Sequence, residues 1–146
     1  MELRKAESRF NLTTRDYAML ADFRRSLRVF LRFSEAAAAK VGLTAQHYQA
    51  MLILRACPAD REVTINDLAQ ELLIKHNSAV GLADRLVREK LVSRESSSDD
   101  RRKVVLILTT RGRKVLAKLA AMHRKQLQLS GPALQRHFAK LSRAPR

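Results

Sequence analysis

The sequence has few of the residues that interrupt helices, crosslink chains or stack on bases. Its 146 residues include four glycines, three prolines, one cysteine, five phenylalanines, two tyrosines and no tryptophan. Because glycine and proline are the main interruptions of helices, we expect most of the chain to be helical. The single cysteine, Cys57, excludes an intramolecular disulfide and any site with several cysteine ligands. Without a second cysteine to resolve an oxidised product, Cys57 is interpreted as an ordinary thiol.

Long apolar runs and the local motifs of enzymes are also missing. No run reaches the roughly 18 apolar residues that cross a bilayer, and the charged start does not resemble a secretory signal. We find no nucleophile motif, no glycine-rich phosphate loop and no recognisable pair of catalytic acids. The four histidines show no metal-ligand spacing. The sequence therefore predicts a cytoplasmic protein that is not an enzyme, with no membrane segment, metal or cofactor.

The sequence has an excess of positively charged residues. Lys and Arg number 29 against 14 Asp and Glu, which gives a formal net charge of +15. Such a balance favours a polyanionic partner, because each phosphate that is neutralised releases counterions. The few aromatic residues offer little for stacking on single strands, so double-stranded DNA is the favoured partner. RNA, an acidic membrane surface and charge for solubility alone are the alternatives.

The apolar spacing predicts about six helices. Thr13 and Asp16 form a capping-box pattern, and apolar residues then recur every three or four positions as far as Gly42. That helix is longer than a compact monomer of this size needs. The later predicted helices run from Thr44 to before Pro58, from Thr64 to about Leu72, from Asn77 or Ser78 to about Lys90, from Thr109 or Thr110 to a break at Ser130–Pro132, and over a short last segment with Leu134, Phe138 and Leu141.

A change of polarity stands out between residues 91 and 112. Two short stretches, 91–95, which begins with Leu-Val, and 103–108, which is apolar after Lys103, flank a tip that is entirely polar. This pattern predicts a β-hairpin with a charged tip, and a disordered loop followed by a helix is the alternative.

Two short helices joined by a tight turn and followed by a hairpin have the order of a winged helix-turn-helix. The helix from Asn77 would then enter the major groove, where asparagine can pair with adenine. Asn77 or Ser78 is alternatively a plain helix cap, and the outer arginines are alternatively solvated. The predicted contacts of this helix are His76, Asn77, Ser78, Val80, Gly81, Arg85 and Arg88.

The polar tip is suited to the adjacent minor groove, where arginine matches the electronegative floor. Asp100 and Arg102 are two residues apart and can form an ion pair that stiffens the turn, so Asp100 would orient an arginine rather than contact DNA. Which of Arg101 and Arg102 reaches the groove stays open, and a solvated loop is the alternative. The predicted wing contacts are Asp100, Arg101, Arg102 and Lys103.

The order Asp100, Arg102, Leu106, Leu108, Thr109, Gly112 resembles the D-x-R-x-x-x-[V/L]-x-L-T-x-x-G signature of the MarR family of regulators. The segments 43–52 and 78–94 also resemble that family, so the likeness covers roughly residues 14 to 142. Two positions depart from it: Lys90 stands where glycine is usual, which would strain a left-handed cap, and His47 stands where glutamine is common.

The resemblance implies a homodimer. Residues 1–42 and 110–146 would form its helical dimerisation region, and 43–109 the winged helix-turn-helix lobe, mainly α with a small β-hairpin. It further implies a repressor of a pseudo-palindromic operator, released when a small phenolic or carboxylate effector binds. The residues suggested for that pocket are Tyr17, Arg24, Arg28, His47 and Tyr48, although Tyr48 is alternatively core and the arginines surface. A constitutive or architectural DNA-binding protein without an effector is the second hypothesis.

Overall fold

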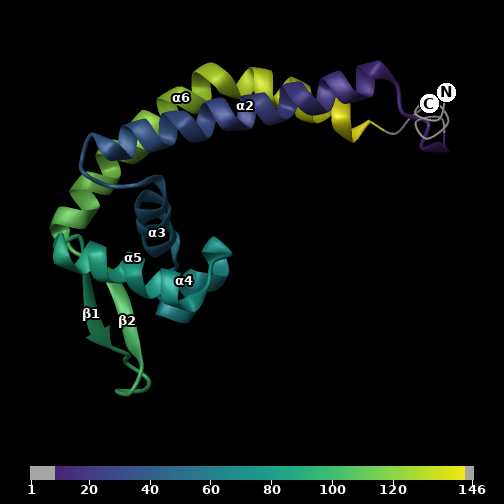
Figure 1. Ribbon diagram of the computed structural model, residues 1–146. Helices are drawn as coiled ribbons and strands as arrows, with labels where there is room; N and C mark the ends of the chain where they lie inside the picture. The colour runs from purple at the N-terminus through teal and green to yellow at the C-terminus, as the bar shows by residue number, and fades with distance from the viewer. Residues whose placement is uncertain (1–8, 144–146) are drawn as a thin grey trace. The chain divides into compact units, whose positions relative to one another are not determined.

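The computed structural model describes residues 9–143 (Figure 1). The chain divides into two compact units. The terminal unit contains the chain up to Phe33 and from Arg124 onward, and the central unit contains Ser34–His123. Two long helices, α2 (Thr14–Ala39) and α6 (Thr110–Ser142), each contribute residues to both units.

In the terminal unit, α2 and α6 lie side by side (Figure 1), and Phe23 packs on Phe138 with ring centroids 6.2 Å apart. The start of α2 is capped as expected. The Thr13 backbone N–H donates to the Asp16 carboxylate at 2.7 Å, and the Asp16 N–H donates back to the Thr13 hydroxyl at 3.3 Å. Both partners of this cap are therefore supplied by four consecutive residues, which is why the sequence revealed it.

The predicted break at Ser130–Pro132 is wrong, because α6 continues through Pro132. The described residues consequently form five helices, one fewer than the six or so expected. A proline removes one backbone donor and crowds the preceding turn, which bends a helix more often than it ends one when both flanks are packed. Here Ser130 donates its hydroxyl to the Gln126 carbonyl at 2.9 Å, and Phe138 beyond the proline is packed on α2.

The central unit consists of three shorter helices and a hairpin, together with the end of α2 and the start of α6. Its elements are α3 (Ala45–Ala56), α4 (Ile65–Leu72), α5 (His76–Arg88), β1 (Val92–Ser96) and β2 (Val104–Leu108). The largest fully buried side chains in this unit are Met51, Leu68, Leu86 and Leu119. They come from α3, α4, α5 and α6, so one core joins the four helices.

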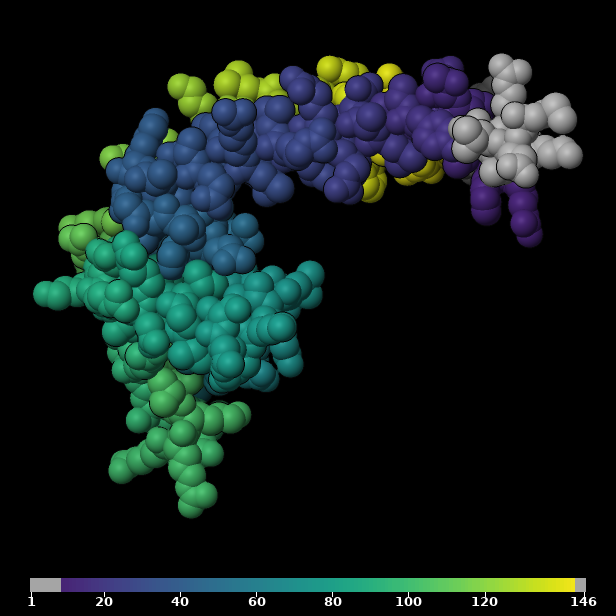
Figure 2. Space-filling model, in the orientation of Figure 1, coloured from purple at the N-terminus to yellow at the C-terminus, as the bar shows by residue number. Residues whose placement is uncertain are grey.

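The two strands form an antiparallel hairpin in which Val92 pairs with Leu108 and Ser96 with Val104. A third segment extends this small sheet: Thr64 forms an isolated bridge with Val105, and the Leu106 N–H donates to the Val63 carbonyl at 2.9 Å. The hairpin prediction is confirmed. We refer to β1, β2 and the tip between them, residues 97–103, as the wing, which stands out from the central unit in Figure 2.

Two residues other than glycine occupy the left-handed backbone region in this unit. Leu73 ends α4 with φ 55° and has 92% of its surface exposed, and Lys90 follows α5 with φ 58°. The strained cap expected at Lys90 is thus present. A side chain in this conformation costs about 1–2 kcal/mol, because its Cβ crowds the following carbonyl.

We expect Leu73→Gly to raise the free energy of unfolding by about 0.5–1 kcal/mol, because the relief of strain exceeds the added chain entropy of the unfolded state. Urea unfolding followed by circular dichroism measures the change. Gln70→Gly provides a matched control in the interior of α4, where glycine should instead cost about 1 kcal/mol. Equal destabilisation of both variants would show that the conformation of Leu73 is not strained.

Candidate nucleic-acid interface

Helix α5 carries the residues that the sequence assigned to the major groove. Its inner face is buried through Ala79, Leu82, Ala83 and Leu86. The outer face exposes six of the seven predicted contacts, and Val80 is half-buried; the exposed ones are His76, Asn77, Ser78, Gly81, Arg85 and Arg88. The amphipathic pattern of α5 therefore presents the predicted residues on its solvent side.

The start of α5 differs from the prediction. The helix begins at His76, and its N-cap is Lys75, whose side chain forms no capping hydrogen bond. The interpretation of Asn77 or Ser78 as a cap is therefore wrong, because both lie inside the first helical turn. Because neither side chain caps the helix, both are exposed at the N-terminal end of α5, where the free backbone N–H groups attract anions.

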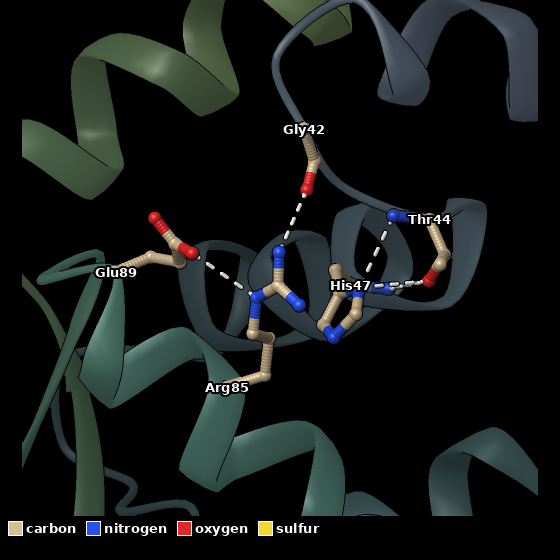
Figure 3. Close-up of polar contacts among 5 residues, drawn as sticks. All are labelled: Gly42, Thr44, His47, Arg85 and Glu89. Carbon is tan, nitrogen blue, oxygen red and sulfur yellow. Dashed lines mark hydrogen bonds and ion pairs between the residues drawn. The ribbon is translucent and has the colours of Figure 1, made fainter.

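Arg85 is held by the protein on both sides, as Figure 3 shows. Its Nε donates to the Glu89 carboxylate at 3.1 Å, and a terminal nitrogen donates to the Gly42 carbonyl at 3.3 Å. The second bond links α5 to the turn that connects α2 with α3. Because the guanidinium is already engaged, Arg88 is the better placed of the two arginines for a phosphate.

At the tip of the wing, Asp100 braces the turn through the backbone. Its carboxylate accepts the Arg102 N–H at 2.9 Å, and its own carbonyl accepts the Lys103 N–H at 3.0 Å. The expected ion pair with the Arg102 side chain is not among the contacts of residues 9–143. The carboxylate therefore fixes the course of the chain, while the side chains of Arg101, Arg102 and Lys103 are exposed.

The base of the wing is tied to the rest of the central unit by two contacts that the sequence did not reveal. Arg94 of β1 forms an ion pair with Asp84 of α5. Glu62, in the loop before α4, accepts hydrogen bonds from Ser97 and Ser98. The partners are 10 residues apart in the first contact and 35 or 36 in the second, so no local pattern predicted them.

The five residues suggested for an effector pocket lie in different units. Tyr17, Arg24 and Arg28 belong to the terminal unit, and His47 and Tyr48 to the central unit. Tyr48 is buried and stacks on His123, with ring centroids 4.0 Å apart and an interplanar angle of 15°. The alternative that Tyr48 is a core residue is thereby supported.

His47 occupies the third helical position of α3, where it completes a capping box (Figure 3). Its Nδ1 accepts the Thr44 backbone N–H at 3.1 Å, and its own N–H donates to the Thr44 hydroxyl at 3.3 Å. Nδ1 can accept only while it carries no proton. Partial burial lowers the pKa of His47, and the nearby Arg85 lowers it further, against smaller opposing effects of Glu35 and Glu89.

We expect this capping box to make stability depend on pH. Because the folded state holds the pKa of His47 below its ordinary value, the unfolded chain takes up the proton first as pH falls, and the protein loses stability from about pH 6.5 downward. Glutamine can also accept the Thr44 N–H, so His47→Gln should retain the cap and reduce that pH dependence. Urea unfolding of both proteins between about pH 7.5 and 5.5 measures the difference, and equal slopes would contradict the assignment.

Other features of residues 9–143 add no further chemistry. These residues contain no cluster of His, Cys, Asp or Glu suited to a metal ion. Among them, no helix has the length and apolar character needed to cross a membrane. The Cys57 thiol is half-buried and donates to the Arg61 carbonyl at 3.2 Å.

The sequence of the central unit matches that of a known family. A family model described as MarR family matches residues 41–103, which include α3, α4, α5 and most of the wing. Among curated proteins, none is significantly similar in sequence.

Solved structures share the fold. AbsC, a MarR family transcriptional regulator from Streptomyces coelicolor, is 25% identical with a TM-score of 0.69, over 92% of this chain and 84% of AbsC. A MepR variant from Staphylococcus aureus bound to an oligodeoxyribonucleotide is 20% identical with a TM-score of 0.64, over 89% and 96%. CouR from Rhodococcus jostii bound to p-coumaroyl-CoA is 22% identical with a TM-score of 0.64, over 71% of each chain.

Proposed function

We propose that the chain is a winged-helix transcriptional regulator of the MarR family, whose model matches residues 41–103, and that it is a homodimeric repressor that binds a pseudo-palindromic DNA operator. The observation that carries this proposal is the placement of exposed groups on the central unit. Helix α5 exposes Asn77, Ser78 and Arg88, and the wing exposes three consecutive cations at its tip. A helix for the major groove and an arginine-bearing loop for the minor groove are the two contacts that a winged helix-turn-helix makes.

The terminal unit supports the homodimer. Apolar side chains that would be buried in a single-chain core are instead exposed along α2 and α6, and Leu129 and Phe138 have 73% and 63% of their surface in solvent. The other apolar side chains of α2 and α6 with more than a third of their surface exposed are Tyr17, Leu20, Leu27, Val29, Leu31 and Leu127. Burying such faces against a second copy would supply the apolar contact that one chain lacks.

We extend the proposal to release of DNA by a small phenolic or carboxylate effector. CouR, which shares the fold, is described as bound to p-coumaroyl-CoA, and Tyr17, Arg24 and Arg28 of the terminal unit carry groups able to bind a phenolic or carboxylate molecule. An effector acts only through a difference in affinity between the binding-competent and released states. A constitutive or architectural protein would show no such difference, so the two hypotheses separate by experiment.

Selection of bound sequences from random duplex DNA at a fixed salt concentration tests the proposal. A recovered palindrome would support a dimer with two equivalent lobes, and footprinting on it would give the half-site spacing. Binding without sequence preference would favour the architectural alternative, and retention of RNA but not duplex DNA would contradict the proposal. Calorimetry with a panel of phenolic acids, in the presence and absence of the selected duplex, then tests the effector.

A further inference from the structure

The carboxylate of Glu62 holds the base of the wing tip with three hydrogen bonds. Its Oε1 accepts the Ser98 backbone N–H at 2.9 Å and the Ser98 hydroxyl at 2.9 Å, and its Oε2 accepts the Ser97 hydroxyl. These bonds stabilise the charged form and so hold the pKa of Glu62 below its ordinary value. The carboxylate is therefore ionised at neutral pH, and both of its oxygens accept hydrogen bonds.

Glu62 itself is in a fixed position. The next residue, Val63, is buried and accepts the Leu106 N–H from β2. Thr64, one residue further on, bridges to Val105 and caps α4 through Asp67. The backbone that carries Glu62 is thus anchored to the second strand of the wing and to the first helix of the helix-turn-helix at once.

The bonds continue from Glu62 into the tip. Ser97 has only 5% of its surface exposed, and while its hydroxyl donates to Glu62, the same oxygen accepts the Asp99 N–H at 3.2 Å. The Ser97 N–H also donates to the Lys103 carbonyl at 2.9 Å, which closes the loop across its base. Ser97 and Ser98 consequently set the direction in which the tip leaves the sheet, and Glu62 holds both serines in place.

We propose that Glu62 is a positioning residue for DNA binding, which fixes the wing tip through Ser97 and Ser98 so that Arg101 and Arg102 are presented to the groove. The inference rests on the proposed function and adds a residue that does not contact DNA. The change in DNA affinity expected on replacing Glu62 is opposite to the change that charge alone predicts. A carboxylate near the DNA-binding surface should repel phosphate, so its removal would tighten binding if charge alone decided.

Two substitutions separate positioning from charge, since Glu62→Ala and Glu62→Gln remove the same charge. Glutamine retains one oxygen that can accept from Ser98, whereas alanine retains none. For a duplex selected from random DNA, we expect Glu62→Ala to bind about tenfold more weakly than wild type and Glu62→Gln to fall between them. Glu71→Ala is a matched control, because it removes the same charge from an exposed position on α4, and among the described residues Glu71 forms no bond to the wing.

Amide hydrogen exchange of the free protein provides a readout that does not depend on DNA. The Ser98 amide should exchange faster in Glu62→Ala, while the buried core amides such as that of Leu68 keep their protection. Equal affinity of the alanine and glutamine variants, or tighter binding by Glu62→Ala, would overturn the positioning role with the proposed function intact. Failure of the wild-type protein to bind any duplex would overturn both.

Discussion

Replacing Gly112 with alanine should lower the free energy of unfolding of the central unit by about 3 kcal/mol or more, the upper range for an atom forced into a packed site. A Cβ at this position would lie 2.0 Å from the Leu91 carbonyl oxygen, 2.9 Å from its carbonyl carbon and 3.2 Å from the Leu108 side chain. The Leu91 carbonyl cannot easily move away, because it accepts the Thr109 N–H at 3.1 Å. The first turn of α6 and the start of the wing would have to separate.

Gly81→Ala is the control for this experiment, since Gly81 also lies in a helix of the central unit but a Cβ there would meet nothing within 4 Å. Alanine at an open helical position should stabilise by up to about 1 kcal/mol. Urea unfolding of the two variants beside wild type measures both effects. Similar stabilities for Gly112→Ala and wild type would show that the helix and the wing do not approach as closely as described.

The second large effect is expected at the wing tip. Arg102→Ala should weaken binding to a selected duplex by about 30-fold or more, because a minor-groove arginine contributes on the order of 1–3 kcal/mol and a dimer would lose two. Arg101→Ala should weaken it less. Fluorescence anisotropy at several salt concentrations measures the affinity, and its salt dependence gives the number of phosphates that each variant neutralises. Unchanged affinity in both variants would mean that the wing stays in solvent.

Asp100→Ala should also weaken binding, although it removes a negative charge. The Asp100 carboxylate holds the Arg102 backbone N–H, and without it the turn that presents the arginines loses its brace. Asp99→Ala is the matched control, since Asp99 carries the same charge one residue away and enters the tip's bonds through its backbone N–H. Tighter binding by both variants would show that charge, not the turn, is what Asp100 contributes.

The features that the sequence predicted correctly are those encoded by neighbouring residues. The capping box of Thr13 and Asp16 lies within four residues, and two short strand-like stretches around a polar tip were enough to indicate the hairpin. Gly112 was recognised from the sequence as the last residue of the family signature, but the reason for a glycine there, the close approach of the Leu91 carbonyl, is known only from the fold.

The features that the sequence did not predict depend on partners distant in the chain. Pro132 was expected to end a helix, but Phe138 beyond it packs on α2. Arg85 was expected either to contact phosphate or to be solvated, yet it donates to the Gly42 carbonyl, 43 residues away in the chain. The start of α5 was placed at a residue suited to capping, whereas the structure uses Lys75 without a side-chain cap. Tertiary contacts outweighed local preference at Pro132 and at Arg85.

The wing tip has a consequence for the kinetics of finding DNA. The Asp100 carboxylate is occupied by a backbone N–H, so three neighbouring cations remain exposed on the segment that projects from the central unit. Charges in such a place act on the approach of a polyanion before any base is contacted, and they raise the association rate in a way that salt suppresses. Discrimination between sequences would then be expressed mainly in how slowly the protein leaves its correct site.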